Sequence, residues 1–187
     1  MSKGVCEERI DVSYLSTKSL ELRAAYKMGC ITMPHIHELM DFTVEAFVVH
    51  NNRVLLIYHT QLHKWLPLGG HIELDEDPEQ ALFREIKEES GLEVDILSQK
   101  PAQQFNGRKF LYPPVYLDVH PITPTHHHIG LVYFATAASD QVTLAADEHE
   151  AIRWFSEAEL QDPAFGIQPD VLFYACDVLR RAAEAQP

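Results

Sequence analysis

The chain has 187 residues, enough for one domain with a sizeable buried core and too few for two full domains. Hydrophobic residues make up 46% and charged residues 23%, close to globular averages, which excludes disordered, collagen-like and coiled-coil chains. The net charge of −13 argues against binding to long nucleic acid or to anionic membranes.

The acidity is concentrated in two segments. Residues 70–95 hold ten acidic and two basic side chains, a net charge of −8, and residues 140–162 hold seven acidic and one basic, a net charge of −6. A small anionic ligand would need metal ions to bind beside either segment.

Cysteine usage and hydropathy bear on the compartment. The three cysteines form no CxxC pair, so neither a disulfide framework nor a Cys-rich zinc site is indicated, and a reducing compartment is favoured. No apolar run approaches the ~18 residues of a membrane helix, and no signal peptide is indicated. We expect a cytoplasmic protein. The sequence leaves its oligomeric state open and is compatible with a homodimer.

The first half of the chain predicts an extension and then strands. Residues 1–40 are weakly helical, and we expect them to pack on or beside a domain formed by residues 41–187. Phe42–His50 and Arg53–Thr60 are rich in strand formers, and the Asn51-Asn52 pair between them tolerates positive φ, which predicts a hairpin. Residues 71–74 (HIEL) are also strand-like.

A helix is predicted from Pro78 to the residue before Gly91. Asp77 is its expected N-cap, and Gln80, three residues on, completes a capping box. Its expected sheet-facing stripe consists of Leu82, Phe83 and Ile86.

The second half predicts further strands and a final helix. Strand-like segments cover residues 92–98, 115–122, 129–137 and 151–155. Ser156 and Glu159 form a second capping box, and a C-terminal helix is expected from Pro169 to about Ala183. His126–His128 is interpreted as a polar turn, with a phosphate or transition-metal contact as the alternative. Together these elements predict an α/β sandwich with a mixed sheet.

Three carboxylates gather on one stripe of the predicted 78–90 helix. Glu85, Glu88 and Glu89 fall within about 100° of arc and repel one another. Arg84 offsets only part of this charge, so the stripe is suited to Mg²⁺ or Mn²⁺, which prefer oxygen ligands. The alternative is a solvated acidic face with Arg84 and Lys87 as counter-ions.

The segment from Gly70 to Leu92 resembles a known motif. It matches the Nudix box G-x(5)-E-x(7)-R-E-U-x-E-E-x-G-U, in which U is aliphatic, and chance would produce such a match on the order of 10⁻¹⁰ per starting point. The matching residues are Gly70, Glu76, Arg84, Glu85, Ile86, Glu88, Glu89, Gly91 and Leu92.

The resemblance to Nudix hydrolases implies an α/β/α sandwich that hydrolyses a nucleoside diphosphate linked to another group, with a divalent metal. It implies Glu88 and Glu89 as metal ligands, Glu85 as a further ligand or the base that activates water, and Arg84 as the residue that orients them. The roles it implies for the rest of the box are a loop contribution from Glu76, backbone room for metal and phosphate at Gly70, and a left-handed helix end at Gly91.

Several residues outside the box are weaker candidates. In several Nudix hydrolases a loop glutamate supplies a further metal ligand or the base, which points here to Glu148 or Glu150, with an exposed acidic turn as the alternative. His59 ends the predicted hairpin, where related proteins place a phosphate-binding Arg or Lys. Arg108, beside Lys109, is either a phosphate contact or solvated.

The substrate remains open at this point. The features associated with particular Nudix substrate classes are absent or displaced, so a nucleoside triphosphate, ADP-ribose, a nucleotide sugar and a dinucleoside polyphosphate are all retained. The alternative to an enzyme is a catalytically silent Nudix-fold module that binds a nucleotide or regulates. The intact carboxylate cluster argues against that alternative.

Overall fold

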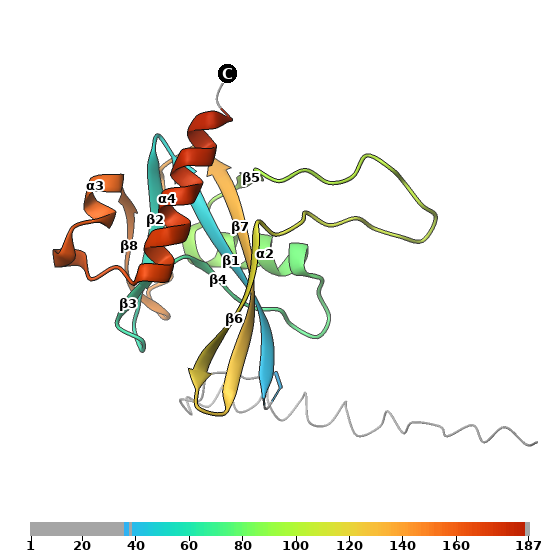
Figure 1. Ribbon diagram of the computed structural model, residues 1–187, viewed down its shortest axis with the longest axis horizontal. Helices are drawn as coiled ribbons and strands as arrows, with labels where there is room; N and C mark the ends of the chain where they lie inside the picture. The colour runs from blue at the N-terminus through green and yellow to red at the C-terminus, as the bar shows by residue number, and fades with distance from the viewer. Residues whose placement is uncertain (1–35, 38, 186–187) are drawn as a thin grey trace, which may run out of the picture. The chain divides into compact units, whose positions relative to one another are not determined.

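The computed structural model describes residues 36–37 and 39–185 (Figure 1). The predicted N-terminal extension therefore lies, up to residue 35, outside the described residues. The strands are β1 (Met40–His50), β2 (Arg53–His59), β3 (Lys64–Leu66), β4 (Leu68–His71), β5 (Val94–Ile96), β6 (Tyr116–Thr123), β7 (His126–Ala137) and β8 (His149–Phe155). The helices are α2 (Pro78–Ser90), α3 (Glu157–Leu160), the 3-10 turn η1 (Pro163–Phe165) and α4 (Pro169–Glu184).

One mixed sheet organises these elements. Its main path runs β3-β2-β1-β7-β5, with β4 also paired to β1, β6 to β7 and β8 to β2. The predicted β1–β2 hairpin is confirmed: Asn51 and Asn52 have φ values of 46° and 58°, and His50 pairs with Arg53. β1 runs parallel to β7 from the Met40–His127 pair to the Val49–Thr136 pair, whereas the other described pairings are antiparallel.

Alternation along β1 directs apolar side chains into two separate cores. Val44 belongs to the core that also holds Leu82 and Ile86 of α2, and Phe47 belongs to the core that holds Val178 of α4. All five side chains are at most 2% exposed. Because α2 and α4 cover separate cores of the same sheet, the predicted α/β/α sandwich is confirmed (Figure 1).

Helix α2 has the two ends that its sequence predicts. The Asp77 carboxylate accepts hydrogen bonds from the backbone N–H groups of Glu79 and Gln80, each at 3.0 Å, and Gln80 Oε1 accepts from Asp77 N at 3.0 Å. Gly91 ends the helix with φ 73°, in the left-handed region that glycine adopts without a Cβ clash. Caps therefore fix both ends of α2, which we call the box helix because it carries Arg84–Glu89 of the motif.

Three expectations are wrong in detail. The segment HIEL is not a strand beyond His71, where β4 ends. Phe83 is 37% exposed and does not share the buried stripe of Leu82 and Ile86. His126–His128 is not a turn, since these residues begin β7, and the residues at both ends of this run are buried because they face inward from the strand.

Within residues 36–37 and 39–185, no helix is both long enough and apolar enough to cross a lipid bilayer.

Candidate active site

Arg84 connects most of the box carboxylates. Its Nε and Nη2 donate to the two oxygens of Glu76 at 3.0 and 2.6 Å, and its Nη1 donates to Glu85 at 2.8 Å and to Glu88 at 3.2 Å. Nη2 also donates to the carbonyl of His71 at 3.1 Å. Such a planar fork fixes the direction of each carboxylate that it contacts. The hydrogen bonds from Arg84 hold the pKa of Glu76 below its usual value.

Glu85 occupies the space that Gly70 leaves open. A Cβ at position 70 would lie 2.4 Å from Glu85 Oε1, closer than non-bonded atoms approach. The Glu85 side chain is only 14% exposed. Burial, opposed by Arg84 and assisted by Glu89 and Glu88, raises the pKa of Glu85 to about 7. The absence of a side chain at Gly70 thus leaves space for a carboxylate whose pKa is raised mainly by burial.

Glu89 is held from two sides at the other end of the cluster. Its Oε2 accepts from Gly69 N at 2.7 Å, and its Oε1 lies 2.7 Å from Nε2 of His149 on β8. The side chains of Glu89 and His149 are 4% and 2% exposed. Burial raises the pKa of Glu89 against these hydrogen bonds, whereas for His149 the bond to Glu89 overcomes burial and the pKa is raised. This buried contact therefore links α2 to β8.

The loop before β8 distinguishes the two candidate glutamates. Ligand atoms of Glu89, Glu148 and His149 all lie within 4.8 Å of one another, so Glu148 reaches the box helix. Glu150 instead lies 3.8 Å from Nδ1 of exposed His63. The Glu148 backbone is fixed, because its carbonyl accepts from Thr60 Oγ1 at 2.8 Å.

His59 lies beside this loop, and its ring centroid is 5.7 Å from that of His149. Its Nδ1 accepts from the backbone N–H groups of Gln61 and Leu62 at 3.2 and 3.3 Å, which leaves the proton of the neutral ring on Nε2. Burial, and then the nearby His149, lower the pKa of His59. The ring is suited to donate a neutral hydrogen bond rather than to form an ion pair with phosphate.

Arg108 and Lys109, the basic pair of the 105–110 loop, make different contacts. Lys109 donates to Asp77 at 2.9 Å and lies 3.4 Å from Glu79, so it neutralises the first turn of α2. Arg108 is exposed, and its backbone N–H closes a turn on Phe105 at 3.1 Å. The structure thus groups Lys109 with the helix cap and gives Arg108 no contact with the box carboxylates among the described residues.

The donor chemistry of this cluster fits a hard divalent cation. Glu85, Glu88 and Glu89 supply carboxylate oxygens from one helix stripe, and Glu148 adds one from the loop. Oxygen-rich sets of this kind suit Mg²⁺ or Mn²⁺. The exposed Glu88 side chain, 62% accessible, lies at the open side of the cluster.

Two residues of the site were not singled out from the sequence. Gly69, with φ 145°, presents its N–H to Glu89, and a Cβ there would lie 2.0 Å from the carbonyl oxygen of Val44. His149 lies between two acidic residues in the sequence, and strand alternation predicts only that it and Glu150 face opposite sides of β8.

Comparisons with known proteins agree with this architecture. The family model described as NUDIX domain matches residues 41–175. A hydrolase of the NUDIX family from Clostridium perfringens is 35% identical with a TM-score of 0.67, covering 76% of this chain and 97% of its own. No curated protein matches the chain.

More distant solved structures share the fold. A MutT NUDIX hydrolase from Burkholderia pseudomallei is 24% identical with a TM-score of 0.54, covering 76% of this chain and 98% of its own. A UDP-X diphosphatase is 16% identical with a TM-score of 0.54, covering 92% of this chain and 80% of its own. With the family model spanning most of the chain and a relative at 35% identity, the chain belongs to the Nudix hydrolase family.

Proposed function

We propose that the protein hydrolyses a pyrophosphate bond in a small nucleoside diphosphate-linked substrate, with Mg²⁺ or Mn²⁺ as the cofactor. The substrate classes are nucleoside triphosphates, ADP-ribose, nucleotide sugars and dinucleoside polyphosphates. The observation that carries the proposal is the convergence of Glu85, Glu88 and Glu89, ordered by Arg84 and by the Gly69 N–H, at one end of the box helix.

The metal would be held by Glu85, Glu88 and Glu89, with Glu148 as a further ligand. When bound, a divalent cation neutralises phosphate oxygens and lowers the pKa of a coordinated water. The residues present supply only part of the counter-charge, because Arg84 is the one cation that contacts both Glu85 and Glu88 among the described residues.

Arg84 and Glu76 have a positioning role in this proposal. The bidentate contact of Arg84 with Glu76 immobilises the guanidinium, which in turn fixes Glu85 and Glu88. A carboxylate fixed in advance costs no reorganisation during the reaction. Gly91 contributes by ending the helix at the required length.

The proposal has two candidates for the base that takes a proton from the attacking water. Glu85 is buried beside Gly70, and Glu148 lies on the loop near Glu89. Substitution distinguishes them: the glutamine variant of the base loses turnover at every metal concentration, whereas loss of a metal ligand is partly recovered by added metal.

The phosphate groups would be bound on the open side of the cluster. Backbone at Gly70 and the Nε2–H of His59 are the proposed contacts near the carboxylates, and Arg108 on the 105–110 loop is the proposed outer contact. A neutral histidine binds phosphate less tightly than arginine, so His59 is expected to affect KM more than kcat.

The decisive experiment is a nucleotide panel covering these four substrate classes, run with Mg²⁺ and with Mn²⁺. At least one class should release a nucleoside monophosphate or orthophosphate, and ¹⁸O-labelled water identifies the phosphorus that is attacked. Glu88→Gln should lower kcat about 10²–10³-fold without unfolding the chain. Glu93→Gln, whose side chain is 92% exposed just beyond the helix, is the matched control and should keep full activity.

The panel also tests the alternative function. Silence across every class with both metals would contradict the enzymatic proposal and favour a nucleotide-binding module. Activity of Glu88→Gln within a few-fold of the parent would contradict the proposed metal ligation.

A further inference from the structure

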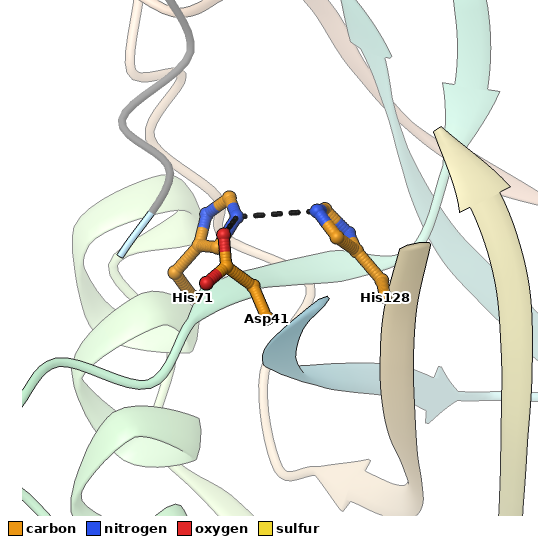
Figure 2. A group of neighbouring side chains, drawn as sticks. All are labelled: Asp41, His71 and His128. Atoms are coloured by element: carbon orange, nitrogen blue, oxygen red, sulfur yellow. Dashed lines mark hydrogen bonds and ion pairs between the residues drawn. The ribbon is translucent and has the colours of Figure 1, made fainter. Parts of the chain in front are cut away.

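A second cluster of ligating side chains is distinct from the carboxylate stripe of the box helix. Asp41 of β1, His71 of β4 and His128 of β7 point toward one another from three strands (Figure 2). One ligand atom from each of the three lies within 4.8 Å of the other two. None of the three belongs to the carboxylate stripe of α2, so the cluster requires its own explanation.

The sheet register brings these residues together. Asp41 pairs with His128 across the parallel β1–β7 contact, and Thr43, two residues after Asp41, pairs with His71 across β1–β4. Residues two apart on a strand face the same side, so Asp41 lies between the two histidines. The arrangement is fixed by backbone pairing and does not depend on loop conformation.

The two distances that His71 makes within the cluster match tetrahedral metal coordination. Nε2 of His71 lies 3.3 Å from Nε2 of His128 and 3.5 Å from Oδ2 of Asp41. Two ligand atoms bonded at about 2.0–2.1 Å to a tetrahedral ion are about 3.3–3.4 Å apart. Both contacts of His71 therefore have the spacing of zinc ligands, and the ligand atoms of Asp41 and His128 lie within 4.8 Å of each other.

Burial and outer contacts further suit a bound ion. Asp41 is fully buried, and the side chain of His71 is 14% exposed. Oδ1 of Asp41 accepts from His37 N at 2.6 Å and Oδ2 accepts from Ile36 N at 3.1 Å, contacts that orient the carboxylate. A buried carboxylate between imidazoles is stabilised by a nearby positive charge, which an ion supplies.

We propose that Asp41, His71 and His128 form a transition-metal site, with Zn²⁺ as the best-suited ion. Two imidazoles and one carboxylate are a borderline-soft set, unlike the all-oxygen cluster of the box. His126 is a further nearby group, since its Nε2 lies 3.3 Å from Oδ2 of Asp41. An ion here ties the first residues of β1 and β7 to the end of β4.

The site would also stabilise the backbone at the start of the Nudix box. His71 directly follows Gly70, and its carbonyl accepts a hydrogen bond from Arg84 at 3.1 Å. An ion that fixes the His71 side chain therefore restricts the backbone on which Arg84 relies. The proposed role is structural and does not depend on the proposed hydrolysis.

Cobalt titration of the metal-free full chain tests the proposal. With excess Mg²⁺ present to occupy the oxygen-rich box, one Co²⁺ per chain should give the intense visible absorption of tetrahedral cobalt, and Zn²⁺ should displace it. Zn²⁺ should also raise the Tm of the parent chain. A parent that shows neither absorption nor a Tm shift would overturn the proposal without affecting the nucleotide panel.

Variants identify the ligands. His71→Gln and His128→Gln should abolish the Co²⁺ absorption and weaken Zn²⁺ binding by more than the 10–100-fold of an outer-shell change. His127→Gln is the matched control, because it lies in the same run of three histidines and on the opposite side of β7. If His127→Gln lost Co²⁺ and Zn²⁺ binding to the same extent, the histidine run as a whole would bind the metal. That result would contradict the proposed site of Asp41, His71 and His128. Far-UV circular dichroism should confirm that each variant is folded. A folded His71→Gln that retains parental binding would also contradict the proposed site.

Discussion

Oε1 of Glu89 lies 2.7 Å from Nε2 of His149, and the two side chains belong to elements 60 positions apart in the sequence. This contact connects the box helix α2 to strand β8. The last glutamate of the box is therefore placed by the sheet as well as by its own helix.

Replacing His149 should destabilise the fold. His149→Asn removes the partner of a buried carboxylate, so the free energy of unfolding should fall by about 3 kcal/mol. Urea unfolding monitored by circular dichroism measures the change. His63→Asn is the control, because His63 is 69% exposed in its side chain and its contact with Glu150 is long, at 3.8 Å. We expect a change within about 0.5 kcal/mol for the control, and equal effects of the two variants would contradict the assigned importance of the buried pair.

A methyl group at position 70 should displace Glu85. The added Cβ in Gly70→Ala would meet Glu85 Oε1 at 2.4 Å, so the carboxylate must move out of the Arg84 hydrogen bond. A displacement of this size should lower kcat about 10²-fold. Gly107→Ala adds a methyl group with nothing within 4 Å and should retain activity, although its positive φ costs some stability. Full activity of Gly70→Ala would show that Glu85 has no fixed role.

Lysine should not substitute for Arg84. Arg84→Lys keeps the charge but cannot make the five contacts that the guanidinium makes with Glu76, Glu85, Glu88 and the His71 carbonyl. We expect kcat to fall by about 10²-fold with a smaller change in KM. Arg180→Lys on α4, where the arginine is 56% exposed, is the control and should leave both constants unchanged.

Glu45 should make stability fall as the pH rises. Burial, opposed by His120 and assisted by Asp118 and Asp170, raises the pKa of Glu45 to about 7. The folded state then binds the proton more tightly than the unfolded state between about pH 4.5 and 7, so unfolding becomes easier across that window. Glu45→Gln should stabilise the chain by roughly 1–3 kcal/mol at pH 8 and have little effect at pH 5. Urea unfolding at both pH values checks this.

Asp177 provides a control of opposite sign. Burial would raise the pKa of Asp177, but its hydrogen bonds with Arg180, Tyr116 and Arg181 lower it. The ionised form therefore stabilises the fold above the unfolded pKa, and the stabilisation disappears as the pH falls through the folded pKa. Asp177→Asn should destabilise the chain at pH 8. If Glu45→Gln and Asp177→Asn shift stability in the same direction at pH 8, the assigned environment of Glu45 is contradicted.

The sequence predicted best what short-range chemistry determines. The ends of α2 follow from Asp77 and Gly91, and the β1–β2 turn follows from Asn51-Asn52, because each depends on residues within a few positions. Arg84 could be assigned to Glu88 by helical spacing, but its stronger contacts with Glu76 depend on how the loop before α2 folds back.

Long-range pairing produced the features that the sequence did not predict. The histidine run at 126–128 reads as polar in isolation, and it becomes part of a strand because β1 pairs alongside it. Phe83 reads as apolar core, yet the stripe of α2 that packs on the sheet includes Ala81 and leaves Phe83 partly accessible. Likewise, His149 finds Glu89 only when β8 has paired with β2.

The parallel β1–β7 contact has a consequence for how the molecule folds. Parallel strands require a long crossover, and pairings between residues distant in sequence form slowly because loop closure must precede them. The hydrogen bonds and caps of helix α2 join only neighbouring residues, so no strand pairing has to precede them. Early in folding, α2 should therefore form before Glu89 contacts Gly69 and His149. Pulsed hydrogen exchange should show the α2 amides protected before those of β7.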